Sequence, residues 1–105
     1  MYMRGWEMRK VNARFSGIGQ HVIAALNDRW QTGRMIGAQI AFPPDMIARR
    51  RARYRELYGN DISESACKAH GVASTLGKLL SSGVIEKRRV NGSLNEYRLV
   101  QKKHD

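Results

Sequence analysis

The sequence predicts an α+β fold that is mainly helical and ends in a β-hairpin. Apolar residues recur at intervals of three and four residues in three parts of the chain, which is typical of amphipathic helices. Near the C-terminus, two short runs of apolar residues instead flank the turn sequence Asn91-Gly92-Ser93, which indicates a hairpin. The expected architecture is therefore three helices, a short strand and a C-terminal hairpin.

The first helix is expected to begin at Ser16, which is a suitable N-cap residue. Its apolar face consists of residues spaced four apart, namely Ile18, Val22, Leu26 and Trp30. Gly33 is expected to break this helix. The alternation of side chains after it predicts a short strand over residues 35–42.

A second helix is predicted over Pro44–Tyr58, because proline suits a first helical turn and Gly59-Asn60 resembles a C-terminal cap. Five of its residues are assigned to the core: Met46, Ile47, Tyr54, Leu57 and Tyr58. Its other face holds a run of five arginines: Arg49, Arg50, Arg51, Arg53 and Arg55.

The third helical segment covers residues 63–82, begins at Ser63 or Ser65 and ends at Gly83. Its predicted core residues are Ala69, Val72, Ala73, Leu76, Leu79 and Leu80. It is either one helix or a compact helix-turn-helix with its turn at His70-Gly71. Two internal glycines favour a break, because each costs a helix about 1 kcal/mol relative to alanine. The uninterrupted apolar stripe favours one helix, and we prefer this interpretation. Gly71→Ala is expected to stabilise one continuous helix and to destabilise a left-handed turn.

The hairpin has two candidate turns, of two or three residues. The three-residue turn places Ile85 opposite Leu99 and Glu86 opposite Arg98, and we prefer it because both pairs are favourable neighbours across strands.

The charge of the chain indicates a polyanionic partner. Nineteen Lys and Arg against nine Asp and Glu give a formal charge of +10 over 105 residues. Because 42% of the residues are apolar, the chain is expected to fold as one domain, residues 16–100, with a basic arm at 1–15 and a basic tail at 101–105. Cys67 is the only cysteine, which excludes an internal disulfide and favours a cytoplasmic location. The sequence offers no apolar run long enough for a membrane span.

Residues 72–99, VASTLGKLLSSGVIEKRRVNGSLNEYRL, resemble the recognition helix and wing of winged helix-turn-helix proteins. The likeness is greatest at residues 79–88, where a leucine, three further residues, a glycine, two aliphatic residues and a basic end follow one another. The resemblance implies binding to double-stranded DNA, and the nearest comparison is with small phage or plasmid regulators. The resemblance does not imply a particular operator or process; our own expectation is a sequence-specific regulator of transcription or replication, associated with the nucleoid when bound.

The expected DNA-binding residues come from three segments. The face of the third helix turned away from the core is expected to hold Ser63, Cys67, His70, Gly71, Ser74 and Lys78, with Lys68 and Thr75 beside it. The wing is expected to contribute Lys87, Arg88, Arg89, Asn91 and Ser93. Arg49, Arg50 and Arg53 are assigned to phosphate contacts.

Enzymatic activity is not expected, because the acidic residues show no paired spacing suited to acid–base or two-metal chemistry. Cys67 and His70 lie three apart but lack further ligands, so neither a metal nor a cofactor is predicted. Two alternative functions are a winged-helix adaptor in a phage or plasmid assembly and an RNA-binding module. The arginine-rich helix also has the character of a calmodulin target or membrane-surface helix. A homodimer is a further expectation, because many such proteins read paired half-sites.

Overall fold

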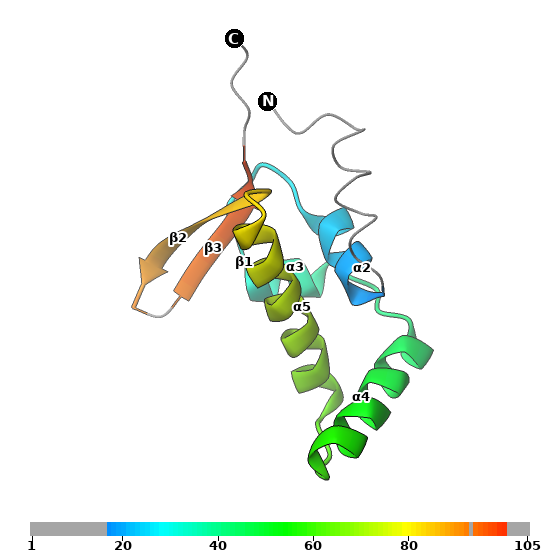
Figure 1. Ribbon diagram of the computed structural model, residues 1–105. Helices are drawn as coiled ribbons and strands as arrows, with labels where there is room; N and C mark the ends of the chain where they lie inside the picture. Colours follow the sequence, from blue (N-terminus) through cyan, green and yellow to red (C-terminus); the bar gives the residue numbers. More distant parts are fainter. Residues whose placement is uncertain (1–16, 93, 101–105) are drawn as a thin grey trace.

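The computed structural model describes residues 17–92 and 94–100. Over these residues the chain is α+β and mostly helical, with one antiparallel sheet of three strands (Figure 1). The elements are α2 (Ile18–Ala25), β1 (Gln31–Thr32), α3 (Gly33–Ala38), α4 (Pro44–Tyr58), α5 (Glu64–Ser81), β2 (Ile85–Asn91) and β3 (Leu94–Leu99). The expected basic arm, the Ser16 cap, Ser93 and the basic tail lie outside the described residues.

The long helix α5 is the centre of the molecule. Figure 1 shows α2 and α3 beside it, the hairpin at its C-terminal end and α4 meeting it at an angle near its N-terminal end. It is one continuous helix, which confirms the preferred interpretation. Ser63 caps it by accepting a hydrogen bond from the Ala66 amide at 3.1 Å. Gly83, with φ of 74°, ends it in the left-handed conformation.

The core forms around the buried side of α5, where Val72, Leu76 and Leu79 pack with residues of α2, of α3 and of the sheet. The predicted core positions Ala69 and Ala73 are wrong, because both are exposed. The buried side of α5 is rotated so that it includes Cys67, Gly71 and Thr75, which lie four residues apart. On this side α2 packs closely on α5 at Gly71.

Helices α2 and α5 lie very close together at Gly71. Of the described glycines, Gly71 leaves the least room for a β-carbon. A β-carbon placed there would lie 2.8 Å from Ile18 Cδ1 and 2.9 Å from Ile18 Cγ2. The glycine therefore serves helix packing rather than a turn. The sequence-based expectation that alanine would stabilise a continuous helix at this position is corrected accordingly.

The segment between α2 and α4 differs from its prediction. The first helix ends at Ala25, and Leu26 is already extended with ψ of 145°, so Trp30 is not part of the helix. The short strand is Gln31–Thr32, and the predicted strand over residues 35–42 is wrong. Thr32 explains the difference, because its hydroxyl accepts a hydrogen bond from the Met35 amide at 3.1 Å and thereby caps α3. The chain consequently has a helix that was not predicted.

Helix α4 has the predicted bounds, with Pro44 in its first turn and Gly59 as a left-handed cap at φ of 74°. Its burial is not as predicted. Ile47 is the buried residue of α4, whereas Leu57 and Tyr58 have 63% and 65% of their surface exposed. The apolar stripe of this helix faces α5 but is not covered by it.

The hairpin has the predicted register, with Ile85 opposite Leu99 and Glu86 opposite Arg98. Strand β1 adds to the other side of β3, where Gln31 pairs with Tyr97, and the strand order is β1-β3-β2. The regular pairing of β2 and β3 shifts between residues 89 and 91, so that Asn91 pairs with Leu94. Two residues therefore separate the strands, and the preferred three-residue turn is wrong. Among the described residues, none of the helices combines the length and apolar character that a bilayer crossing requires.

Candidate nucleic-acid interface

The two faces of the hairpin have different surroundings. Side chains alternate between the faces of a strand, and directly paired residues share a face. Ile85 and Leu99 are paired and buried in the core, so their face of the sheet turns toward α5. Lys87 and Arg89 follow Ile85 at intervals of two and therefore lie on this same face, which we call the inner face of the hairpin.

The opposite, outer face of the hairpin is occupied by a compact charged cluster around Trp30. The guanidinium carbons of Arg88 and Arg98 lie 4.5 Å and 4.3 Å from the centre of the Trp30 ring. Arg88 Nη2 is 2.7 Å from Glu96 Oε1, and Arg98 forms an ion pair with Glu86. Arg88, which the sequence assigned to DNA, is thus already engaged within the sheet.

On the inner face, Lys87 and Arg89 are both exposed, as the sequence predicted. Within residues 17–92 and 94–100, neither forms an ion pair with a carboxylate. Asn91, at the end of β2, is also exposed. The charges of Arg88 and Arg98 on the outer face are therefore balanced by glutamates, whereas those of Lys87 and Arg89 on the inner face are not balanced by any described carboxylate.

The exposed side of α5 provides hydrogen-bonding groups next to small residues. His70, Ser74 and Lys78 are exposed, in agreement with the prediction. Ala73 and Gly77 lie among them, and a β-carbon at Gly77 would have no neighbour within 4 Å. A surface of this kind allows another molecule to come close to the helix backbone.

Three residues predicted on or beside that exposed side lie elsewhere. Cys67 and Gly71 are buried, and Thr75 has 6% of its surface exposed. The Thr75 hydroxyl donates a hydrogen bond to the Gly71 carbonyl oxygen at 2.9 Å. The prediction that these residues are accessible was wrong. The four-residue spacing of Cys67, Gly71, Thr75 and Leu79, mostly small residues, is the signal that could have placed them on the buried side of α5.

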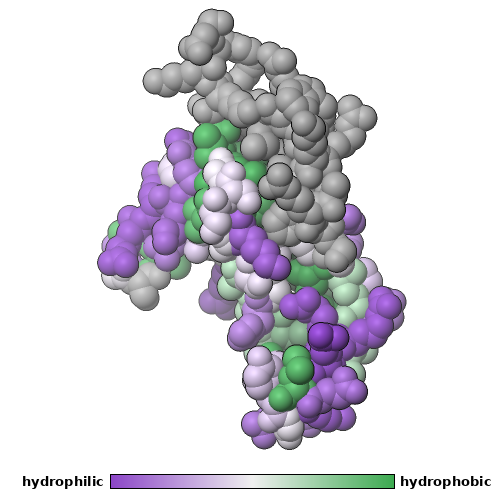
Figure 2. Space-filling view, viewed as in Figure 1, coloured by the Kyte–Doolittle hydropathy of each residue, from purple (hydrophilic) through white to green (hydrophobic). Residues whose placement is uncertain are grey.

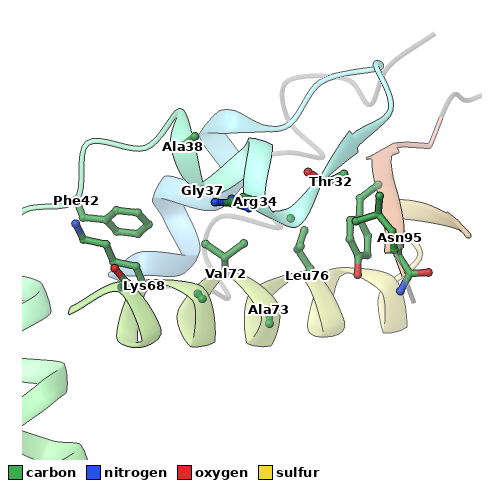
Figure 3. A pocket seen from close by; sticks show the side chains of 15 residues that line it. Thr32, Arg34, Gly37, Ala38, Phe42, Lys68, Val72, Ala73, Leu76 and Asn95 are labelled. Carbon is green, nitrogen blue, oxygen red and sulfur yellow. The ribbon is translucent and has the colours of Figure 1, made fainter. Parts of the chain in front are cut away.

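Lys68 lies on the other flank of α5, beside a groove of about 740 Å³ between α3, α5 and β3. Figure 3 shows this groove with Lys68 and Phe42 near one end and Asn95 near the other. Lys68 Nζ is 3.0 Å from Glu64 Oε1 and 5.6 Å from the centre of the Phe42 ring. The hydrogen bond and positive charge of Lys68 lower the pKa of the Glu64 carboxyl. Sequence analysis missed Asn95 as a residue of this groove.

The arginines of α4 have several different partners. Arg49 Nη2 is 3.4 Å from Asp45 Oδ2, and Arg55 pairs with Asp61. The Nε of Arg51 donates a hydrogen bond to the Ile62 carbonyl oxygen at 2.8 Å.

Arg50 and Arg53 instead line a cleft between α4 and the N-terminal part of α5, together with His70. At 1.5 Å per residue, α5 is about 27 Å long, so the α4 arginines and the hairpin cations lie near opposite ends of this helix. Figure 2 shows hydrophilic side chains gathered over the hairpin and over α4. The sequence-predicted site is therefore divided into two separate basic surfaces.

Comparison of the chain with protein families, with curated proteins and with solved structures gave no match. Its function is accordingly inferred from the residues and their geometry. In the part of the chain that the structure describes, no three His, Cys, Asp or Glu side chains are placed to hold a metal ion.

Proposed function

We propose that this protein is a winged-helix protein that binds double-stranded DNA, with α5 as the recognition helix and the β2–β3 hairpin as the wing. The order of α2, β1, α3, α5 and the hairpin supports this assignment, with α4 as an addition between α3 and α5. The short strand β1 pairs with the hairpin, as the proposed wing requires for support. The proposed role is that of a sequence-specific regulator of transcription or replication.

The distribution of charge over the hairpin is the observation on which the proposal rests. Lys87 and Arg89 are exposed on the inner face, which they share with the buried Ile85, and neither has a carboxylate partner among the described residues. Arg88 and Arg98, on the outer face, are both paired with glutamates. Phosphate contacts fix the register of a protein on a duplex, and under this proposal Lys87 and Arg89 would make them while α5 binds the bases.

The exposed side of α5 suits the major groove of DNA. This groove is about 12 Å wide and admits an α-helix. Ala73 and Gly77 allow the helix backbone to approach, and Ser74 and Lys78 supply hydrogen-bonding groups beside them. Lysine binds guanine acceptors and serine binds several base edges, so both residues are candidates for reading sequence.

The test compares two double variants of equal charge in fluorescence anisotropy with a labelled duplex of random sequence. Lys87→Gln/Arg89→Gln is expected to weaken binding tenfold or more. Loss of two phosphate contacts should also reduce the slope of log affinity against log salt concentration by about 1.8. The matched control, Arg49→Gln/Arg55→Gln, removes arginines that Asp45 and Asp61 already compensate, and less than a threefold change is expected. Equal losses in the two double variants, or no binding of duplex by the wild type, would refute the proposal.

Base reading is tested separately by selecting bound fragments from random duplexes. Lys78→Ala is expected to weaken binding to a selected duplex more than binding to a random duplex. If Lys78 contacts a base directly, the difference between the two losses should be about 1–3 kcal/mol. The reason is that Lys78 lies on α5 rather than on the wing. A uniform loss on all duplexes would instead make Lys78 a phosphate contact.

A further inference from the structure

The cleft between α4 and α5 is a second surface, at the opposite end of α5 from the hairpin, and it shares His70 with the exposed side of α5. It has a volume of about 240 Å³ and lies between the last turns of α4 and the first turns of α5. Tyr54, Leu57 and Ile62 give it apolar walls, and Arg50 and Arg53 line it as well. A cleft of this size accommodates one large side chain but not a duplex.

The apolar wall of this cleft is unusually exposed. Tyr54 and Leu57 continue the stripe that begins at Ile47, the buried residue of α4. Leu57 and the adjacent Tyr58 nevertheless have 63% and 65% of their surface exposed. Exposed apolar residues that gather in one place, with polar residues around them, mark binding surfaces.

The positive charge of the cleft comes from two arginines of α4 that have no carboxylate partner among the described residues. Arg49, Arg51 and Arg55 each have a partner on α4 or in the loop that follows it. Arg50 and Arg53 form no ion pair with any carboxylate in residues 17–92 or 94–100. They are three residues apart on one face of α4, so both are available to an anionic molecule in the cleft.

We propose that this cleft binds a short acidic peptide segment of a partner protein. One aromatic or large aliphatic side chain of the peptide would pack between Leu57 and Ile62. Carboxylates on either side of it would pair with Arg50 and Arg53, whose planar guanidinium groups bind carboxylates with two parallel hydrogen bonds. Tyrosine and arginine are also the residues that most often dominate the binding energy of protein interfaces.

A peptide fits the cleft better than single-stranded nucleic acid does. Bases bind by stacking on accessible aromatic faces. Tyr54 and Tyr58 pack on each other instead, with ring centres 4.7 Å apart and planes inclined by 46°. They do not form two parallel faces between which a base could insert. This inference does not depend on the proposed DNA binding, because the hairpin lies at the other end of α5.

The experiment uses the full chain and a fluorescein-labelled peptide in which one phenylalanine is flanked on both sides by aspartate and glutamate. Binding is followed by fluorescence anisotropy, with a dissociation constant in the micromolar range expected. One control peptide has serine in place of phenylalanine, and a second has asparagine and glutamine in place of the acids. Each change is expected to weaken binding tenfold or more, because the cleft offers both an apolar wall and uncompensated cations.

Variants of the protein then locate the site. Arg50→Gln/Arg53→Gln and Leu57→Ser are each expected to weaken peptide binding at least tenfold. The matched control, Arg49→Gln/Arg55→Gln, should change it less than twofold. These side chains are exposed or line the cleft, and circular dichroism spectra equal to the wild-type spectrum would establish that the variants fold. Lys87→Gln/Arg89→Gln should retain peptide binding, which separates this site from the proposed DNA-binding surface.

Three results would overturn the inference. Absence of binding to the acidic peptide would reject it directly. An equal loss in the Arg49/Arg55 control would show attraction to net charge rather than to the cleft. Tighter binding of labelled oligothymidine than of the peptide, lost in the Arg50/Arg53 variant, would assign the cleft to single-stranded nucleic acid.

Discussion

Gly71→Ala is expected to lower the free energy of unfolding by about 1–2 kcal/mol, the net of about 1–3 kcal/mol for inserting a carbon into a packed core and the gain in helix propensity. The added β-carbon would lie 2.8 Å from Ile18 Cδ1, and Ile18 has 2% of its surface exposed, so it has little room to move. This steric cost exceeds the gain of up to about 1 kcal/mol from the higher helix propensity of alanine. Urea unfolding followed by far-UV circular dichroism measures the change.

Gly77→Ala is the matched control, since it makes the same substitution in the same helix. A β-carbon at Gly77 has no neighbour within 4 Å, so stability is expected to rise by about 0.4–1 kcal/mol. A decrease at Gly77 similar to that at Gly71 would mean that α5 tolerates alanine poorly throughout, and not that α2 crowds one position.

A double-mutant cycle tests the contact itself. Ile18→Ala alone is expected to cost about 2–5 kcal/mol, because it leaves a cavity in the core. In that background Gly71→Ala should be neutral or stabilising, because its β-carbon now occupies vacant space. If Gly71→Ala were equally destabilising with and without the Ile18 side chain, the tight approach of α2 to α5 would not be the cause.

Trp30→Ala is expected to lower the free energy of unfolding by about 2–3 kcal/mol, estimated from the cost of removing a partly buried tryptophan and its contacts with two cations. The ring of Trp30 supports Arg88 and Arg98 on the outer face of the hairpin. Arg88→Ala should cost less than about 1 kcal/mol, because it removes one partly exposed ion pair and leaves the Trp30–Arg98 contact. The same unfolding measurement gives both values.

The neighbouring residues Arg88 and Arg89 connect this cluster with function. Arg89→Ala is expected to weaken duplex binding severalfold, whereas Arg88→Ala should change it by less than twofold, since Arg88 is paired with Glu96 on the outer face. Equal losses at the two positions would indicate that both faces of the hairpin contact DNA. Both residues are arginines and they are adjacent in sequence, so the comparison tests only which face of the hairpin each side chain occupies.

With these two basic surfaces, each end of α5 has its own proposed function. Its C-terminal half would bind DNA together with the wing, and its N-terminal turns would form a peptide cleft with α4. His70 borders this cleft and is also on the exposed side of α5. A partner protein held in the cleft would therefore lie close to the DNA contacted by α5.

The sequence alone determined the features that local energies control. Gly59 and Gly83 end their helices because each adopts a positive φ, and Pro44 starts α4 because a first turn needs no proline N–H. The hairpin register followed from cross-strand pairing, and the uninterrupted apolar stripe of α5 indicated one helix. The exposure of Ser74, Lys78, Lys87 and Arg89 was also predicted correctly.

Which basic residues are free and which small residues are buried depends instead on long-range packing. Arg88 is engaged because Trp30, far away in sequence, is brought onto the sheet when α2 ends early. Thr75 is buried on the side of α5 that contains Gly71, where Ile18 of α2 packs. Such contacts join residues tens of positions apart, and neither periodicity nor composition specifies the rotation of one helix against another.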